Sequence, residues 1–346
     1  MTLTDTTERA PSSDQPQTRR RRPSLERATV LWNLERFMLL GLFAAVLVLF
    51  TVLPSTAATF PTAQNIRNVL SNESVVAILA LGSMVPLVVG QFDVSVGATA
   101  GMAQIAVAAT MSKHGWALVP AICSGLVIGT VVGAINGFLV AKARINALIG
   151  TLGVMTIIIG LVQLYTSGAT IVTNISPNIV KLGSGTWLGI PPTTWILIGV
   201  ALFVAYLLGQ TPLGRHMHFV GSNPTAARLV GLRIDTIVFR AFVISGFFAG
   251  LAGALIVARN GNGDPSNGSN YLLPALTAPF LGATAIRPGR FNIPGTLLAI
   301  FFLAFTINGL NLAGVADWIN NVFYGSALVI AVTLSAIVAR HRAEST

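Results

Sequence analysis

Long apolar blocks separated by short polar connections occupy most of the chain between residues 37 and 339. An α-helix rises about 1.5 Å per residue, so about 20 mostly apolar residues cross a hydrocarbon core of about 30 Å. The third and eighth blocks are the shortest and are rich in Gly, Ala, Thr or Pro. The pattern predicts an all-α, polytopic membrane helical bundle of about ten transmembrane helices, centred on residues 37–53, 74–89, 97–111, 117–140, 147–166, 193–209, 237–258, 271–285, 293–312 and 320–339.

The basic residues divide unevenly between alternate connections of this bundle. Cytoplasmic loops keep Lys and Arg, so the crowded connections are expected inside. With the amino terminus inside, only four of the 21 basic residues fall outside: Arg67, Lys113, Lys181 and Arg259. Both termini are therefore predicted to be cytoplasmic, since eight or nine spans would mix the two groups.

The composition excludes several classes of protein. Hydrophobic residues make up 53% of the chain and charged residues 9%, whereas a soluble domain carries roughly 25% charged residues. An ordinary cytosolic enzyme and a disordered protein are excluded, and the single cysteine, Cys123, excludes an internal disulfide framework.

The basic charge is concentrated near the amino terminus. The net charge is +10, and Arg19 to Arg22 are consecutive, but no aromatic residues are interleaved as in proteins that bind single-stranded nucleic acid. We therefore expect no nucleic-acid partner. Residues 1–35 are predicted to form a disordered basic cytoplasmic tail whose arginines hold orientation or contact membrane lipid, and residues 341–346 a second short tail.

Few ionisable groups lie near the apolar blocks. Asp93 is taken as the one acidic residue beside a long hydrophobic run. Either this acid or the serine two residues later caps the following helix, or Asp93 and Gln91 line a water-filled path. Gln104, Asn136 and Asn308 are uncharged; they suit a path for a neutral, hydroxyl-rich solute, or they join neighbouring helices.

Glycines recur every four residues in the fourth block and again in the seventh. This spacing is typical of membrane helices that approach one another closely. The glycines that predict this packing are Gly125, Gly129, Gly133, Gly137, Gly246 and Gly250.

The longest inner connection, residues 210–236, contains signals for a short helix. Asn223 is suited to the N-cap, Pro224 to the first helical position and Gly231 to the stop. Such a helix docks in a groove of a partner protein or lies on the membrane interface. The residues that we assign to this candidate docking segment are Gly221, Asn223, Pro224, Ala226, Ala227, Arg228, Leu229 and Gly231.

Four blocks of sequence, 90–102, 136–156, 214–232 and 308–315, resemble the permease subunits of ribose- and xylose-type ABC importers. The resemblance covers residues 35–340 and implies a multi-pass permease domain, at 36–340, in a bacterial inner membrane. It further implies a monosaccharide or related neutral polyol as cargo, an extracytoplasmic sugar-binding protein, and a second permease copy or a paralogue. Segment 210–236 resembles the family's coupling segment, which sits in a groove of the ATPase subunit.

The chain contains no Gly-Lys dipeptide and therefore no phosphate-binding loop of the Walker type. We expect no enzymatic activity in this chain, with ATP-Mg bound and hydrolysed on a separate ATPase polypeptide. His216 and His218 are the only paired candidates for a metal site, and we expect them on a solvated or docking face, without metal.

The segment 268–295 departs from the family pattern. The family's acidic residue before the eighth span is missing, and Arg287 and Arg290 stand in the usual Gly-Gly-rich loop. Because of this departure, an alternative remains open: an ABC permease whose cargo is a branched-chain amino acid, a nucleoside or a furanone signal. An ion-coupled secondary transporter is less consistent with the scarcity of ionisable residues.

Overall fold

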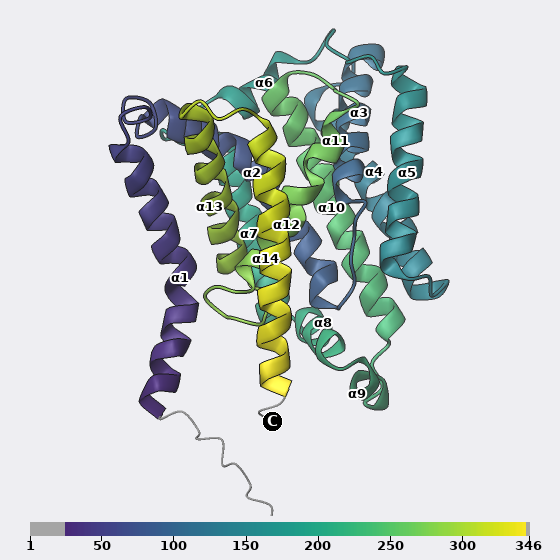
Figure 1. Ribbon diagram of the computed structural model, residues 1–346. Helices are drawn as coiled ribbons and strands as arrows, with labels where there is room; N and C mark the ends of the chain where they lie inside the picture. The colour runs from purple at the N-terminus through teal and green to yellow at the C-terminus, as the bar shows by residue number, and fades with distance from the viewer. Residues whose placement is uncertain (1–24, 344–346) are drawn as a thin grey trace, which may run out of the picture.

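A computed structural model describes the backbone of residues 25–343 and the side chains of residues 36–334. Of the predicted tails, residues 1–24 and 344–346 lie outside these described residues, whereas the backbones of 25–35 and 341–343 are helical, in α1 and α14. Within them the regular elements are helices, which form one bundle (Figure 1). The helices are α1 (Leu25–Val52), α2 (Ala63–Val88), α3 (Val96–His114), α4 (Leu118–Gly137), the π-helix η1 (Phe138–Lys142), α5 (Ala147–Thr166), α6 (Pro177–Ser184), α7 (Pro192–Gln210), α8 (Pro212–Ser222), α9 (Pro224–Leu229), α10 (Ile234–Asn260), α11 (Asn267–Asn270), α12 (Leu272–Gly282), α13 (Ile293–Leu312) and α14 (Trp318–Ala343).

Every predicted apolar block coincides with a helix, but the helices differ in reach. Six are long and apolar enough to cross a membrane: α2, α4 with η1, α5, α7, α10 and α13. The described parts of α1 and α14 add shorter apolar stretches, Arg36–Val52 and Trp318–Leu334. By contrast α12, in the eighth block, has 11 residues, about 16 Å, which is half of a hydrocarbon core. The eighth block is thus no full-length span by itself.

The interior of the bundle is built around α2 and α10. Of the most apolar stretch of each helix, 83% of residues are buried in α2 and 78% in α10, against 28% in α4 and in α5. α10 packs against α2, α3 and α4, whereas α12 packs against α2, α13 and α14. α1 and α5 stand at opposite edges (Figure 1). The poorly buried helices leave large aliphatic side chains exposed, as lipid-facing helices do.

The glycine stripe predicted from the sequence forms the contact between α4 and α10. A Cβ atom added at Gly129 would lie 2.6 Å from the Gly250 nitrogen, and one added at Gly250 would lie 2.9 Å from the Cα of Leu126. The two backbones therefore touch, which only glycine permits. The predicted close packing is confirmed.

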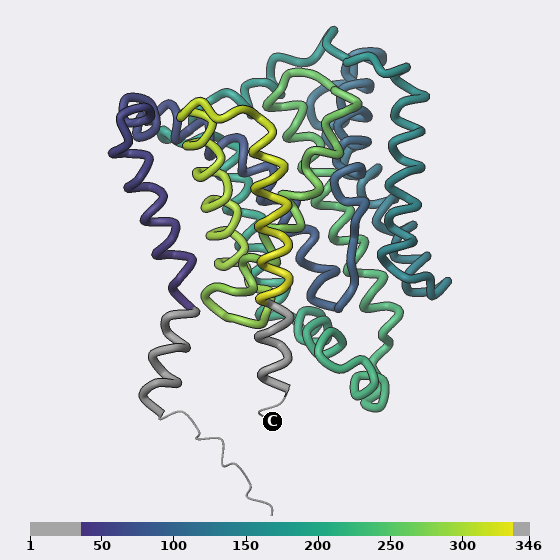
Figure 2. Tube along the Cα trace, viewed as in Figure 1, coloured from purple at the N-terminus to yellow at the C-terminus, as the bar shows by residue number. Residues whose placement is uncertain are grey.

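The chain enters α1 and leaves α14 at one end of the bundle, the end that carries α8 and α9 (Figure 1). α8 and α9 form a green projection beyond the lower ends of α5 and α10 (Figure 2). We refer to this end as the α8–α9 end.

Candidate functional site

The predicted short helix in the connection 210–236 is confirmed as α9. The Asn223 side-chain oxygen accepts a hydrogen bond from the Ala226 nitrogen at 2.9 Å, and Pro224 opens the helix. Gly231, with φ at +82°, ends it in a conformation that favours glycine. The sequence did not predict α8, which is capped by the Thr211 side chain on the Gly214 nitrogen.

The exposed face of α9 differs from the predicted one at a single residue. Leu229 and Val230 are 84% and 66% exposed, and Arg228 is also exposed. Ala227, which was expected to offer an apolar docking contact, is fully buried in the core of this chain. The exposed side chains here are therefore Leu229, Val230 and Arg228, whereas Ala227 packs α9 against the bundle.

α8 is in backbone contact with the end of α2. A Cβ atom at Gly221 would overlap the Val88 carbonyl, so a side chain at this position forces the two helices apart. Met217 and Val220 of α8 are buried against the main core. The projection is therefore packed directly against the end of α2 and the main core.

His218 of α8 lies near the charge of Arg290, which belongs to the connection between α12 and α13. The pKa of His218 is lowered by its burial and by the nearby positive charge of Arg290. The atypical inner segment thus lies beside the projection. No group of three His, Cys, Asp or Glu residues in the described part of the chain is placed to hold a metal ion.

Asp93 lies on the irregular segment between α2 and α3, in a buried hydrogen-bond network. Its carboxylate accepts bonds from the Ser95 nitrogen at 3.0 Å, the Ser95 hydroxyl at 2.7 Å and the Ser245 hydroxyl at 3.1 Å. The Asn136 amide donates to the Ser95 hydroxyl at 2.7 Å. Asp93 is 2% exposed, and neither it nor Ser95 makes a side-chain cap bond to α3. The capping interpretation is wrong in detail, because Asp93 instead joins α10 to its own segment.

The remaining path candidates do not meet at this network. Asn308 forms a two-way amide pair with Asn65, at 2.9 and 3.2 Å, which ties α13 to the start of α2. Gln104, fully buried on α3, donates to the Asn262 carbonyl at 3.3 Å, and its own side-chain oxygen has no partner. Gln91 is partly exposed. Of the five path candidates, the structure brings together only Asp93 and Asn136, which are linked through the Ser95 hydroxyl.

A second group of polar residues escaped the sequence analysis. Glu73 lies within α2, so Asp93 is not the only acidic residue in or beside an apolar run. Glu73 is near the positive charge of Arg259 and near the hydroxyl groups of Tyr271 and Tyr324. One Glu73 oxygen is shielded from solvent and has no hydrogen-bond partner. The predicted apolar block begins at residue 74, whereas α2 begins at Ala63, so only the structure shows that Glu73 belongs to this apolar helix.

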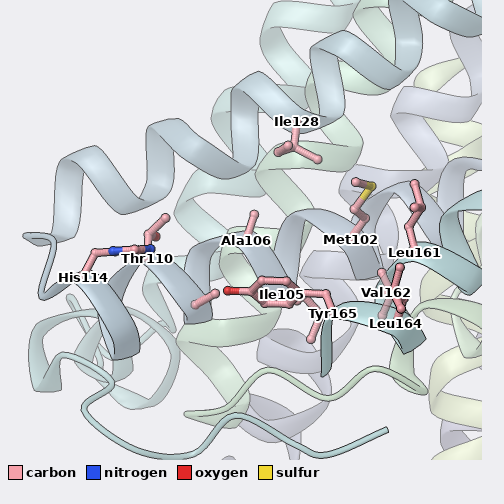
Figure 3. Close-up of a pocket in the computed structure, with 11 residues that line it drawn as sticks. Met102, Ile105, Ala106, Thr110, His114, Ile128, Leu161, Val162, Leu164 and Tyr165 are labelled. Atoms are coloured by element: carbon pink, nitrogen blue, oxygen red, sulfur yellow. The ribbon is translucent and has the colours of Figure 1, made fainter. Parts of the chain in front are cut away.

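The cavities nearby differ in chemistry. One of about 720 Å³, between α3, α4 and α5, is lined mainly by apolar side chains, with Tyr165 and Met102 among them (Figure 3). A smaller one of about 250 Å³, between α3, α5 and α11, includes Gln163, Ser266 and Ser269. The larger cavity lacks the polar lining that a hydroxyl-rich solute requires.

Comparisons with known proteins agree that the chain is similar to transport permease components. The family described as "Branched-chain amino acid transport system / permease component" matches residues 65–332. The ribose import permease protein RbsC of Escherichia coli (strain K12) is 34% identical over 307 residues, which cover 88% of this chain and 94% of that protein.

Two further relatives carry other cargo names. The L-arabinose ABC transporter permease protein AraH of Azospirillum brasilense is 30% identical over 84% of this chain and 86% of that protein. The autoinducer 2 import system permease protein LsrC of Photorhabdus laumondii is 30% identical over 82% and 85%, respectively. No solved structure matches the chain.

Proposed function

We propose a transport function for this chain, which belongs to the family described as branched-chain amino acid transport system / permease component. It is the multi-pass membrane permease subunit of an ABC importer for a monosaccharide or related neutral polyol. The observation that carries this proposal is the 34% identity to a ribose import permease over 88% of the chain. The relatives named for ribose, arabinose and autoinducer 2 favour this cargo over branched-chain amino acids or nucleosides.

In the proposed topology both termini and the α8–α9 end are cytoplasmic. Ten apolar helices thread the membrane between residues 36 and 340, and α12 is buried within the protein rather than exposed to lipid over its whole length. Two observations support this topology: the chain enters α1 and leaves α14 at the α8–α9 end, and the basic residues concentrate on that side.

Segment 210–236 is the proposed coupling segment, with α9 seated in a groove of a separate ATPase subunit that binds ATP-Mg. Its exposed Leu229, Val230 and Arg228 supply an apolar anchor and a charge, and its rigid contact at Gly221 leads to α2. A sugar-binding protein delivers cargo at the opposite end, and a second permease copy or paralogue completes the assembly.

The proposed translocation path has two polar groups along it. The Asp93 and Asn136 network lies toward the α8–α9 end, while Glu73 and Gln104 lie toward the other. The buried oxygens of Gln104, Asn136 and Glu73 that lack partners are all acceptors, and sugar hydroxyls are donors that satisfy such atoms. Gln91 and Asn308 flank the path, with Asn308 held by Asn65.

The test begins with gentle solubilisation of the chain from its native membrane and mass spectrometry of the proteins that stay bound. We expect an ATPase with a Walker motif and a secreted binding protein. The complex is then reconstituted in proteoliposomes, where uptake of labelled ribose should require ATP and persist when ion gradients are collapsed. Uptake that follows an ion gradient without ATP refutes the proposal and favours a secondary transporter.

A further inference from the structure

A basic cavity of about 430 Å³ lies at the α8–α9 end of the bundle. Two segments far apart in the sequence form it: the connection from η1 to α5, and the turn from α9 into α10. Four cationic side chains, Lys142, Arg144, Arg228 and Arg233, line the cavity together with one carboxylate, Asp235. Its lining therefore carries an excess of positive charge that calls for an anionic ligand.

The start of α10 adds to this positive potential. Ile234, Asp235 and Thr236, in the first turn of this 27-residue helix, line the cavity. Arg233 at the N-cap makes no side-chain bond to the amide groups of that turn. The N–H groups of Ile234 and Thr236 already donate to the carbonyls of Leu232 and Arg233, so the helix contributes its dipole, whose positive N-terminal end favours phosphate and similar anions.

The surface beside the cavity is apolar and open. Phe138 of η1 is 57% exposed, and Leu148 and Ile149 in the first turn of α5 are 53% and 68% exposed. Ile145, between Arg144 and α5, is 40% exposed. A ligand with a phosphate in the cavity and hydrocarbon chains on this surface satisfies both features, which a free ion does not.

We propose that the cavity binds the phosphate of an anionic phospholipid headgroup, with its acyl chains against η1 and the start of α5. Basic pockets between membrane helices on the inner side recognise such headgroups. Arg228 belongs to α9, so a bound headgroup joins the connection between η1 and α5 to the α8–α9 projection. This site goes beyond sugar transport and does not depend on the identity of the cargo.

The test measures lipid binding to the purified full chain in a neutral detergent, by native mass spectrometry. The probes are dioleoylphosphatidylglycerol, dioleoylphosphatidylcholine and inorganic phosphate. The variant Lys142→Gln/Arg144→Gln removes two cations from the cavity but leaves α9 intact. The matched control, Arg287→Gln/Arg290→Gln, removes the same charge from another inner connection, and Lys142→Arg/Arg144→Lys keeps the charge.

Each basic residue near a lipid headgroup contributes about a five-fold gain in affinity, so the cavity variant should bind phosphatidylglycerol about 30-fold more weakly. The control and the charge-conserving variant should bind it within about three-fold of the original chain. Equal losses in the cavity variant and the control overturn the proposal. A second result also overturns the proposal: the original chain binds inorganic phosphate, the cavity variant does not, and both bind phosphatidylglycerol equally. The occupant of the cavity is then a free anion.

A third outcome also overturns the proposal. Here the cavity variant, kept in phosphatidylcholine alone, loses a co-purifying ATPase, while its binding of phosphatidylglycerol is unchanged. In that case an acidic protein surface occupies the cavity. Size-exclusion profiles that match the original chain confirm that each variant is folded.

Discussion

The contact between α4 and α10 offers a quantitative test of the packing, through the substitution Gly129→Ala. The added Cβ lies 2.6 Å from the Gly250 nitrogen and 2.7 Å from its Cα, and closer still to the Gly246 carbonyl oxygen. All three are backbone atoms, so no side chain can turn away. The helices must separate by roughly 1 Å to restore the 3.5–4.0 Å spacing of carbon atoms.

The cost follows from two opposing effects. Overpacking a well-packed core costs about 1–3 kcal/mol, and backbone partners place this site at about 3 kcal/mol. Replacement of glycine by alanine returns about 1 kcal/mol of helix propensity, which leaves a net loss of about 2 kcal/mol. We expect the melting temperature of the full chain in detergent to fall by about 3–6 °C.

The matched control is Gly160→Ala on α5. A Cβ atom at Gly160 meets nothing within 4 Å, so this variant gains helix propensity without a clash. It should melt at or slightly above the temperature of the original chain. If Gly129→Ala melts together with Gly160→Ala, the close contact between α4 and α10 does not exist, and the small-residue interpretation of the stripe is refuted.

Three further variants test the site. Asn223→Ala removes the cap of α9, which costs about 1 kcal/mol. It should lower uptake of the cargo sugar and ATPase co-purification at unchanged membrane abundance, whereas Thr225→Ala on the same helix should lower neither. Glu73→Gln replaces a carboxyl group by an amide and should reduce ATP-driven uptake of the cargo sugar about ten-fold, while ATPase co-purification is unchanged. Equal uptake by the variant and the original chain contradicts a place for Glu73 on the path. Arg290→Gln should raise the pKa of His218, because a positive neighbour is removed, although burial keeps that pKa below its ordinary value. An NMR titration of the imidazole measures this change, and an unchanged pKa contradicts the proximity of the two groups.

The sequence predicted what depends on local chemistry. The blocks at 147–166 and 293–312 match α5 and α13 to the residue, and the cap, first turn and stop of α9 follow from Asn223, Pro224 and Gly231. Such features depend on residues a few positions apart, and the chain alone contains them.

The convergence of distant residues was not predictable in the same way. Asn308 and Asn65 are 243 positions apart, and Asp93 and Ser245 are 152 apart, so only the packed bundle reveals these partners. Ala227 shows the same limit, since a six-residue helix does not disclose which face turns inward. The hydropathy pattern also placed the start of the second span after Glu73. A charged residue lowers the mean hydropathy of its stretch of sequence, even where the helix continues through it.

The placement of the acidic groups bears on how the transporter is driven. An ion-coupled carrier needs an intramembrane carboxylate that exchanges its cation with water during the cycle. Asp93 instead accepts three hydrogen bonds, from Ser95 and Ser245, and Glu73 lies near the positive charge of Arg259. Release of Asp93 for ion binding means breaking the hydrogen bonds that join its segment to α10. Because α8 touches the end of α2 at Gly221 and Val88, a force applied to the projection acts on α2 without any intramembrane titration. This geometry favours work delivered from the α8–α9 end, as nucleotide-driven closure of a docked ATPase delivers it.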